Sequence, residues 1–566
     1  MTSAADTHLL LRALCDELGR CGMRHACTAP GSRNSPIVVS LVRERRITCW
    51  SHIDERCAGF FALGAAKASG RPAAVTCTSG TAAANLAPAV IEAREARVPL
   101  IVITADRPAE LRDVGAGQAI DQLKLYGDAV KWFVEVEPPD ASPASLRWIR
   151  QLACRAYWSA LGGRPGPVHL NLPLREPLVL DGPLPTDPLP ARSNGEPWVR
   201  PVPRPAVANA TGRIEVPPRG VIVAGRLEHD GDGGRAGETA ARLGWPLLAD
   251  PLSGARHASA AIATYDLLLR DRGFAQRARP EMVVRVGDLP TSKPLRAWLA
   301  SLDGVRQLAI DPDGTWQDPD AVVSERDDRD PGPALEALTP DARPDSNWSA
   351  TWRAADDAAA ATLAATLGVE LSEPAVARTL GTVLGPEVAL FSAASMPIRD
   401  LELYLPARTP LPRVLSNRGA NGIDGTVSSA FGVAAAGDRP VVLLIGDVAL
   451  AHDLGGLLAA RRLGLELTIV VLNNDGGGIF HFLPISGDTD AFERHIATPH
   501  GLRFEHAAAL YGLAHERPVT TSELRSALAR SVGSGQTTII EIATDRNENV
   551  ALHRRLADAA LAAIPR

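Results

Sequence analysis

Two polar pairs follow neighbouring apolar stretches in the last third of the chain. Gly446-Asp447 ends one stretch, and Asn473-Asn474 ends the next. Asp447 and Asn474 are 27 residues apart, which is enough for one crossover helix, so two parallel strands would bring their side chains together. Carboxylate and amide oxygens suit Mg²⁺, which prefers octahedral oxygen ligation and often bridges phosphates. The spacing therefore predicts a metal–diphosphate site.

A glycine run, Gly476-Gly477-Gly478, follows the second pair. Glycines leave backbone groups open to a phosphate or a metal. The alternative is that each polar pair is an ordinary turn, which is the commoner explanation for either pair alone. The crossover spacing and the strand–helix–strand context together favour the metal–diphosphate site.

Parallel sheets are needed to position these motifs. Strands are predicted at 73–78, 99–104, 220–224, 246–249, 282–286, 307–310, 440–445 and 467–472, with helical stretches at 58–68, 82–96, 236–243 and 452–463. Alternating strands and helices predict the α/β class, with three doubly wound parallel-sheet domains. In such sheets, ligands bind beyond the carboxyl ends of the strands.

Two breaks divide the chain. A proline-rich stretch covers 189–205, and a stretch rich in Asp, Pro and Arg covers 327–349. They predict domains at 1–188, 206–340 and 350–566.

Composition excludes several functional classes. The 566 residues are 45% hydrophobic, 22% charged and 4% aromatic, and 59 Lys+Arg against 65 Asp+Glu give a net charge of −6. No basic surface for nucleic acid is expected from this balance. No signal sequence and no apolar run of about 18–20 residues is evident, so no membrane insertion is expected. The seven cysteines are an odd number without a C-x-x-C motif, which favours a reducing, cytoplasmic setting.

The Gly-Asp and Asn-Asn pairs resemble the signature of thiamine-diphosphate enzymes. This resemblance implies thiamine diphosphate with Mg²⁺ or Mn²⁺ as cofactors. It implies that the domain at 1–188 binds the pyrimidine end of the cofactor and the domain at 350–566 its diphosphate. Asp447 and Asn474 would be metal ligands, a backbone carbonyl near Gly476 a third, and Gly446 would lie at the diphosphate. It also implies a glutamate brought by another subunit, and Glu55 is the candidate.

Glu55 precedes a helical stretch rich in small residues. In the family, the protonated carboxyl donates to the cofactor's pyrimidine ring and favours the imino tautomer, which removes the thiazolium C2 proton. Burial in an apolar pocket would raise the pKa of this carboxyl and keep it protonated. The alternative is a surface acid that stabilises the start of a helix.

Further blocks occur in family order in both outer domains. They are Ala29–Pro36, Asp54–Arg56, Thr78–Thr81, Thr104–Pro108, Gly115–Gln118, Ser416–Gly425 and Asn473–Pro484. Together they resemble the MenD family of 2-succinyl-5-enolpyruvyl-6-hydroxy-3-cyclohexene-1-carboxylate synthases, which act in menaquinone biosynthesis. The resemblance implies decarboxylation of 2-oxoglutarate and addition of the resulting four-carbon carbanion to isochorismate.

Both implied substrates are dicarboxylates, and arginine binds carboxylates through two parallel hydrogen bonds. The resemblance assigns Arg399, Arg418 and Ser395 to the 2-oxoglutarate-derived carboxylate. It assigns Ser32, Arg33, Arg107, Gln118 and Lys293 to isochorismate. Ile423 would support the bent cofactor, and Ile479 and Phe480 would form an apolar wall. For each arginine, the alternative is a solvated surface charge.

Three positions depart from the family pattern. Gly117 replaces an expected amide, Ala449 an expected hydroxyl near the diphosphate, and Pro294 a second basic residue. These changes affect affinity rather than the reaction class. His52 is a candidate acid–base group, with a packed histidine as the alternative.

Three other functions stay open at this point. One is another thiamine-diphosphate-dependent 2-oxo acid carboligase or decarboxylase, similar to acetohydroxyacid synthase. Another is a dinucleotide-dependent oxidoreductase, although the glycines at 231, 233 and 237 are one residue too widely spaced for G-x-G-x-x-G. The third is a non-catalytic protein that has kept the fold. The resemblance implies a homodimer or homotetramer with active sites between subunits.

Overall fold

Three six-stranded sheets, all parallel, confirm the predicted α/β class. The computed structural model describes residues 3–202, 212–227, 229, 231–488 and 490–565. The chain divides into two compact units: unit 1 contains Met1–Arg204, Asn417–Asp438 and Ala451–Leu467, and unit 2 contains Pro205–Ser416, Arg439–Leu450 and Thr468–Arg566. The end of the predicted 189–205 break and the predicted start of the middle domain at 206 lie outside the described residues.

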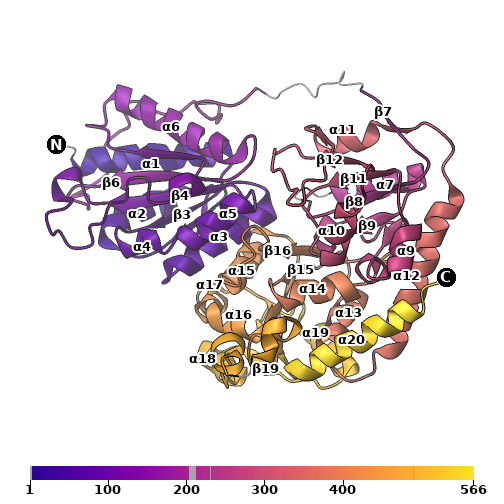
Figure 1. Cartoon of the computed structure of the whole chain (residues 1–566). Helices are drawn as coiled ribbons and strands as arrows, with labels where there is room; N and C mark the ends of the chain where they lie inside the picture. Colours follow the sequence, from indigo (N-terminus) through magenta and orange to yellow (C-terminus); the bar gives the residue numbers. More distant parts are fainter. Residues whose placement is uncertain (1–2, 203–211, 228, 230, 489, 566) are drawn as a thin grey trace. The chain divides into compact units, whose positions relative to one another are not determined.

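Unit 1 is built around one sheet. Its order is β2 (Thr48–Ser51), β1 (His25–Thr28), β3 (Ala73–Cys77), β4 (Leu100–Asp106), β6 (Pro167–Pro173) and β5 (Trp132–Glu135). Helices α1 (Ala4–Cys21) and α6 (Pro143–Leu161) lie on one face, and α3 (Glu55–Ser69) and α5 (Ala87–Glu95) on the other (Figure 1). The strands β3, β4 and β6 are buried along their whole length, as expected for a sheet covered on both faces.

The helical stretch predicted at 82–96 is two helices. The short α4 (Thr81–Ala84) ends before Leu86, and α5 begins at Ala87 with Pro88 in its first turn. A proline lacks the amide hydrogen that a continuous helix would use, but its fixed φ suits the first turn of a new one.

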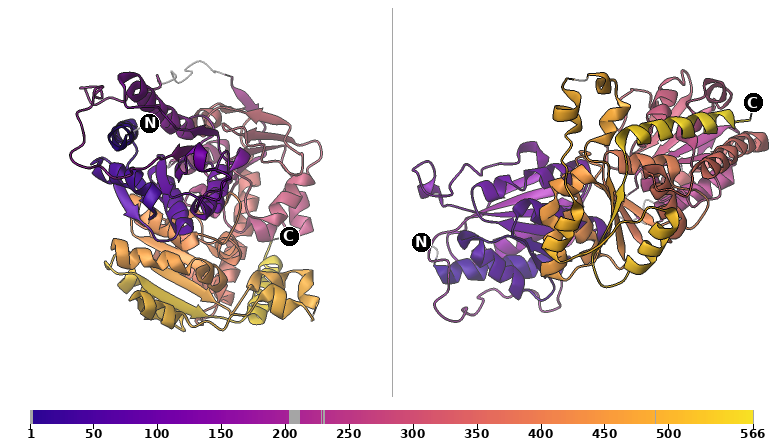
Figure 2. Two further views of the ribbon diagram at one scale, coloured as in Figure 1. Left: turned by 90° about the vertical axis from the view of Figure 1, so that its left-hand side faces the viewer. Right: turned by 90° about the horizontal axis from the view of Figure 1, so that it is seen from below.

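Unit 2 contains the other two large sheets. The first has the order β10 (Ala261–Ile262), β9 (Leu247–Ala249), β8 (Gly220–Ala224), β11 (Met282–Val286), β12 (Arg306–Ile310) and β13 (Glu325–Asp327). The second has the order β16 (Arg413–Ser416), β15 (Ala389–Ser392), β17 (Val441–Gly446), β18 (Thr468–Asn473), β20 (Thr538–Ala543) and β19 (Ala514–Glu516). Helices cover both faces of the orange and yellow C-terminal sheet (Figure 2).

A single hydrophobic core joins the two large sheets of unit 2. Trp352 of α12 (Ser346–Thr366) is fully buried in it. Its ring meets Phe274 and Trp298 edge-on, with ring centroids 5.0 and 5.9 Å apart. Such edge-to-face aromatic contacts add to the stabilisation from burial alone.

The remaining elements of unit 2 that bear on the site are α10 (Lys293–Ala300), α13 (Glu373–Val383), α14 (Met396–Tyr404) and α20 (Arg546–Ala562).

The crossover between β17 and β18 differs from the predicted helix at 452–463. It consists of α16 (Asp447–His452), a 3₁₀ turn (Leu454–Leu457) and α17 (Leu458–Leu463). The break falls at Asp453, whose buried carboxylate accepts hydrogen bonds from the backbone amide and hydroxyl of Ser428, at 2.7 and 3.0 Å. This tertiary contact accompanies the interruption, which the local sequence does not indicate.

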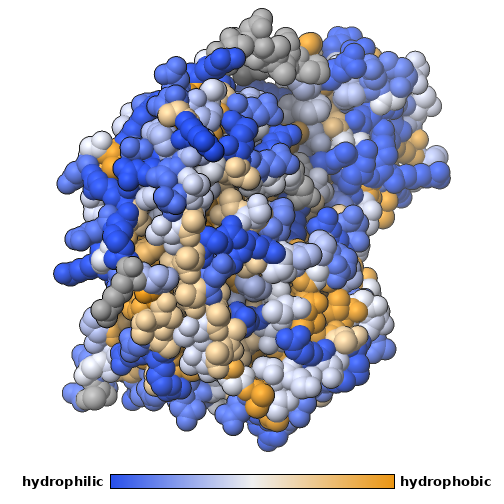
Figure 3. All heavy atoms as spheres, turned by 90° about the vertical axis from the view of Figure 1, so that its right-hand side faces the viewer, coloured by the Kyte–Doolittle hydropathy of each residue, from blue (hydrophilic) through white to orange (hydrophobic). Residues whose placement is uncertain are grey.

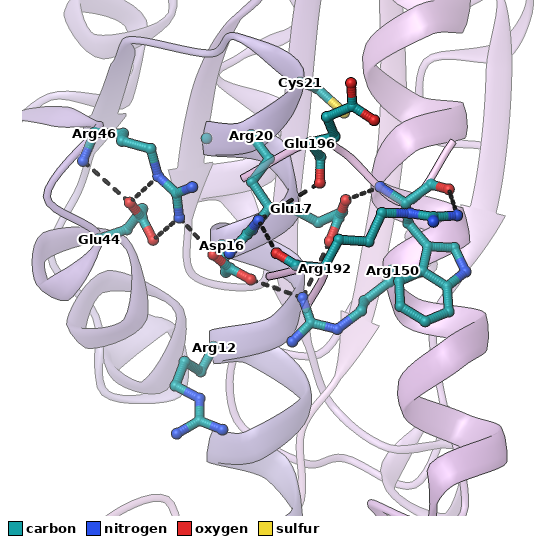
Figure 4. A network of polar contacts seen from close by, with 12 residues as sticks. Arg12, Asp16, Glu17, Arg20, Cys21, Glu44, Arg46, Arg150, Arg192 and Glu196 are labelled. Carbon is teal, nitrogen blue, oxygen red and sulfur yellow. Dashed lines mark hydrogen bonds and ion pairs between the residues drawn. The ribbon is translucent and has the colours of Figure 1, made fainter. Parts of the chain in front are cut away.

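A buried ionic network in unit 1 ties the segment after β6 to the helices (Figure 4). Arg150 of α6 donates to Asp16 and Glu17 of α1, at 2.7 and 3.1 Å. The same Glu17 accepts from the backbone amide of Trp198. Removing one member would leave a buried charge without its partner, so the network fixes this segment against α1 and α6.

Within the part of the chain that the structure describes, every helix is too short or too polar to cross a membrane. On the face shown in Figure 3, hydrophilic side chains predominate and hydrophobic ones gather in smaller patches.

Candidate active site

Asp447 stands at the junction of two neighbouring strands. It directly follows β17, which pairs in parallel with β18 so that Gly446 lies opposite Leu472. The side chain is 2% exposed. Its Oδ1 accepts from the backbone amide of Val448 at 2.7 Å. Its Oδ2 accepts from the amides of Asn474 and Gly476, at 3.1 and 2.9 Å. Burial raises the pKa of Asp447 in spite of these hydrogen bonds, and a bound cation would offset that cost.

Asn474 completes the predicted donor pair. Its Nδ2 donates to Oε1 of Glu373 at 2.8 Å, which leaves Oδ1 as the outward acceptor. This Oδ1 is buried and has no hydrogen-bond partner among the described residues. Buried acceptors are rarely left unpaired in proteins, so the oxygen fits a metal ligand.

The backbone at Gly476 explains the glycine run. Its φ is +140°, and a Cβ there would lie 2.4 Å from the carbonyl oxygen of Ala497, so only glycine fits. Among the described residues, no group of three or more His, Cys, Asp or Glu side chains could hold a metal. The donors predicted here are of a different kind: one carboxylate, one side-chain amide and one backbone carbonyl.

Two residues at this site were not predicted from the sequence. Nε2 of His500 lies 3.2 Å from Oδ2 of Asp447. Glu373 begins α13 and is held by Asn474 and by the hydroxyl of Thr544, at 2.8 and 3.2 Å. Burial raises the pKa of Glu373 to about 7. In the sequence, Glu373 has the pattern of an ordinary helix-start acid, and no motif surrounds His500.

Gly446 directly precedes Asp447 in the chain, and Ala449 follows two residues after it. A Cβ built at Gly446 would meet open space among the described residues, which leaves room for a ligand at this strand end. Ala449 is buried and supplies no hydroxyl. Phe480, the expected apolar wall, is 37% exposed in the 3₁₀ turn Gly478–Phe482.

Unit 2 brings three further predicted residues to one cavity of about 600 Å³, lined among others by Lys293, Arg399 and Ile479. Arg399 donates from Nη1 to the carbonyl oxygen of Ser395 at 2.5 Å. Ser395 has a φ of +70°, a strained conformation for a residue with a side chain, and such strain is common at functional sites. Burial lowers the pKa of Arg399, and a carboxylate ligand would counteract this effect.

Unit 1 holds the predicted glutamate. Glu55 is the first residue of α3, and the preceding Asp54 caps the helix by accepting from the amide of Arg56 at 2.8 Å. Glu55 is half-buried, and desolvation raises its pKa. The direction agrees with a carboxyl that must stay protonated to donate a hydrogen bond.

The predicted isochorismate residues of the first domain gather at one edge of the unit 1 sheet. Arg33 follows β1 and Arg107 follows β4, so both lie beyond the carboxyl ends of strands. Arg33 donates to Glu176 at 3.1 Å, and Arg107 donates to the hydroxyl of Ser79 at 3.0 Å. Burial lowers the pKa of Arg107, and the charge of Arg33 lowers it further. Two neighbouring cations of this kind favour an anionic ligand.

Ser32 and Gln118 of unit 1 are both exposed. Gln118 has a φ of +57°, and its carbonyl lies against Gly80 of the loop after β3. A Cβ built at Gly117 beside it would meet no atom of the described residues within 4 Å, so the space next to this position is open.

His52 has the properties of a packed histidine. It is buried against Phe61, with ring centroids 4.6 Å apart. Burial and the charge of Arg462 lower the pKa of His52 to about 4. The ring is therefore neutral at pH 7, which favours the packing interpretation over an acid–base role.

Arg418 and Ile423 lie on the loop between β16 and α15 (Thr426–Ala436), a segment that belongs to unit 1. The predicted site residues thus form two sets. Unit 1 holds Ser32, Arg33, Glu55, Arg107, Gln118, Arg418 and Ile423, and unit 2 holds Lys293, Ser395, Arg399, Gly446, Asp447, Asn474, Gly476, Ile479 and Phe480.

Sequence comparisons extend these observations to the whole chain. The N-terminal TPP-binding domain of thiamine pyrophosphate enzymes matches residues 10–125. The middle domain of thiamine pyrophosphate enzymes matches 193–392, and the C-terminal TPP-binding domain matches 401–542.

Three relatives that match nearly the whole chain share one name, 2-succinyl-5-enolpyruvyl-6-hydroxy-3-cyclohexene-1-carboxylate synthase. The protein of Geobacillus kaustophilus is 44% identical over 559 residues, covering 96% of each chain. That of Chloroflexus aurantiacus is 41% identical, covering 96% of this chain and 94% of its own. That of Halobacterium salinarum is 41% identical, covering 99% of each. With three matching domains and these relatives, the chain belongs to the MenD family of thiamine-diphosphate-dependent 2-succinyl-5-enolpyruvyl-6-hydroxy-3-cyclohexene-1-carboxylate synthases.

Proposed function

We propose that this protein is the transferase that decarboxylates 2-oxoglutarate and adds the resulting succinyl carbanion to isochorismate. The products are 2-succinyl-5-enolpyruvyl-6-hydroxy-3-cyclohexene-1-carboxylate and CO₂, and the step belongs to menaquinone biosynthesis. The observation that carries the proposal is the buried, unpaired Oδ1 of Asn474 beside the carboxylate of Asp447. It supports a divalent metal at the strand ends where a diphosphate would lie.

The residues of unit 2 fit the metal and the diphosphate. Asp447 and the Oδ1 of Asn474 would be ligands of Mg²⁺ or Mn²⁺, with a backbone carbonyl near Gly476 as the third. The amides of Asn474 and Gly476 hold the carboxylate of Asp447 in place before any metal arrives. The open space at Gly446 suits an adjacent phosphate.

Thiamine diphosphate, when bound, supplies the carbanion nucleophile and the electron sink that decarboxylation of a 2-oxo acid requires. The chain supplies a proton donor for this cofactor in Glu55, whose pKa desolvation raises. A neutral carboxyl donates a hydrogen bond that an ionised one cannot.

Cationic side chains match the charges of the substrates. Arg399 at the unit 2 cavity and Arg418 would hold the distal carboxylate of the 2-oxoglutarate portion, with Ser395 beside Arg399. Arg33 and Arg107 would hold the carboxylates of isochorismate, assisted by Ser32, Gln118 and Lys293. The charge of Arg33 lowers the pKa of Arg107, so the two guanidinium groups are close enough to interact. This supports a dianionic substrate on their side of unit 1.

We further propose a homodimer as the smallest active assembly, with Glu55 of one chain serving the metal site of the other. A homotetramer would contain the same pairs twice. Intersubunit pairing is an expectation from the family.

Product identification by mass tests the function. Purified protein is mixed with thiamine diphosphate, Mg²⁺ and 2-oxoglutarate, with and without isochorismate. The expected result is the succinylated cyclohexene product only when both substrates are present. Turnover of pyruvate without turnover of 2-oxoglutarate would instead indicate an acetohydroxyacid synthase-like enzyme.

A further inference from the structure

We propose that Glu92 is a positioning residue that fixes the loop carrying Arg418, and thereby the affinity for 2-oxoglutarate. Glu92 lies on α5, far in sequence from Arg418, and none of the predicted motifs includes it. The inference deepens the proposed function and rests on the proposed role of Arg418.

Glu92 binds the backbone directly after Arg418. Its Oε1 accepts from the amide of Gly419 at 2.9 Å, and its Oε2 accepts from the amide of Ala420 at 2.7 Å. Glu92 is 3% exposed, and the Nζ of Lys67 lies 3.9 Å from Oε1. Hydrogen bonds from backbone amides to a buried carboxylate are charge-assisted and stronger than neutral ones. The two carboxylate oxygens of Glu92 thus accept hydrogen bonds from two successive residues of one loop.

The steric fit at Gly419 supports the same conclusion. A Cβ at this position would lie 2.5 Å from the amide nitrogen of Ala96 and 2.8 Å from the carbonyl oxygen of Glu92. Both atoms belong to backbone at the end of α5, which cannot move aside easily. The loop is therefore seated against α5 at a distance that only glycine permits.

Neighbouring contacts hold the rest of the loop. On the other side of Arg418, Nδ2 of Asn417 donates to the hydroxyl of Ser429 at 2.9 Å. Farther along, a Cβ at Gly425 would overlap the ring of Phe60, so this end also lies tightly against α3. Arg418 consequently sits between two fixed points, Asn417 and the Gly419–Ala420 amides.

This arrangement suits a residue that must bind a small carboxylate. A guanidinium can no longer make both of its parallel hydrogen bonds to a carboxylate when the backbone that carries its side chain shifts by about 1 Å. Without Glu92, two buried amides would lose their acceptor, and the loop would have to move to reach water. Glu92 contacts both residues directly after Arg418, one through each carboxylate oxygen.

The test compares Glu92→Gln with Arg418→Ala and with the double variant in the holoenzyme. Gln keeps the size of the side chain but removes the charge and places an NH₂ group against one of the two amides. We expect the KM for 2-oxoglutarate to rise by about tenfold or more, with the KM for isochorismate changed by less than about twofold. In the double variant, the two effects should not add, because both act through the same guanidinium. Glu95→Gln, on the exposed side of the same helix, is the matched control and should leave both KM values unchanged.

A second variant separates positioning from general loss of stability. Gly419→Ala leaves Glu92 intact but displaces the loop, so it should raise the same KM selectively. Thermal unfolding of each variant shows whether the fold survives. An unselective loss of activity in both Glu92→Gln and Gly419→Ala, or additive effects of Glu92→Gln and Arg418→Ala, would overturn the inference.

Failure of the inference can be distinguished from failure of the proposed function. If Arg418→Ala raises the KM for 2-oxoglutarate and Glu92→Gln does not, only the role of Glu92 is wrong. If the wild-type protein does not convert 2-oxoglutarate, or if Arg418→Ala has no effect on its KM, the proposed function or site is wrong and the inference falls with it.

Discussion

The backbone amide of Asn474 donates to the carboxylate of Asp447 at 3.1 Å, so the ends of β17 and β18 are joined by the two residues predicted to bind the metal. The bond orients Asp447 without using the side-chain oxygen of Asn474. That oxygen stays available, and the pair is organised before a ligand binds.

Replacement of Asp447 by Ala should abolish metal-dependent binding of thiamine diphosphate. The carboxylate is the single charged ligand of the proposed site, so we expect the affinity for the cofactor in the presence of Mg²⁺ to fall by at least about 100-fold. Isothermal titration calorimetry with and without Mg²⁺ measures this change. Asp488→Ala, at an exposed turn of unit 2, is the control. Undiminished Mg²⁺-dependent binding in Asp447→Ala would show that the metal is held elsewhere.

Replacement of Glu55 by Gln should separate cofactor binding from cofactor activation. Gln has nearly the same shape but cannot act as the acidic donor that the raised pKa of Glu55 provides. We expect thiamine diphosphate and Mg²⁺ to bind almost normally, while exchange of the cofactor C2 proton with deuterium slows by about 100-fold or more. Proton NMR after acid quench measures the exchange. A wild-type exchange rate in this variant would refute the role of Glu55.

Mixing these two variants tests the intersubunit proposal. Each homodimer of Asp447→Ala or Glu55→Gln should be nearly inactive. A heterodimer formed by subunit exchange would have one site with both changes and one site with neither. Random exchange of equal amounts should therefore restore about a quarter of the wild-type activity. If each site were built from a single chain, mixing would restore nothing.

Stability should depend on pH through Asp453. Burial raises the pKa of Asp453 from 3.8 to about 6, so between these pH values the folded protein binds more protons than the unfolded chain. The contribution of Asp453 to stability is therefore fully present below about pH 4 and is lost as the pH rises through 6. A pKa difference of this size corresponds to about 3 kcal/mol.

The variant Asp453→Asn provides the comparison, because it cannot ionise. The Tm of the wild type minus that of Asp453→Asn should decrease from pH 4 to pH 6 and stay constant above that. Differential scanning calorimetry at closely spaced pH values measures the difference. Parallel Tm curves for the two proteins would show that Asp453 does not titrate in this range.

The local sequence was sufficient to predict the elements whose signals are continuous. The apolar stretches that became β3, β4, β17 and β18 were predicted to within two residues, because a strand buried on both faces is a continuous apolar run. Asp447 and Asn474 were placed together because consecutive parallel strands end at the same edge of a sheet. Where a predicted helix was interrupted, as at Asp453, the contact came from Ser428, which no local pattern contains.

The sequence by itself determined the α/β class and, through motif resemblance, the family, and it predicted that Asp447 and Asn474 lie together at neighbouring strand ends. Only the tertiary structure decided which side chains hold those donors and loops in place. Glu373, His500 and Glu92 are distant in sequence from the residues they contact, and each resembles an ordinary helix or loop residue until the fold brings it against its partner. A charge or an amide removed from water must be paired inside the protein, so burial makes such contacts strong.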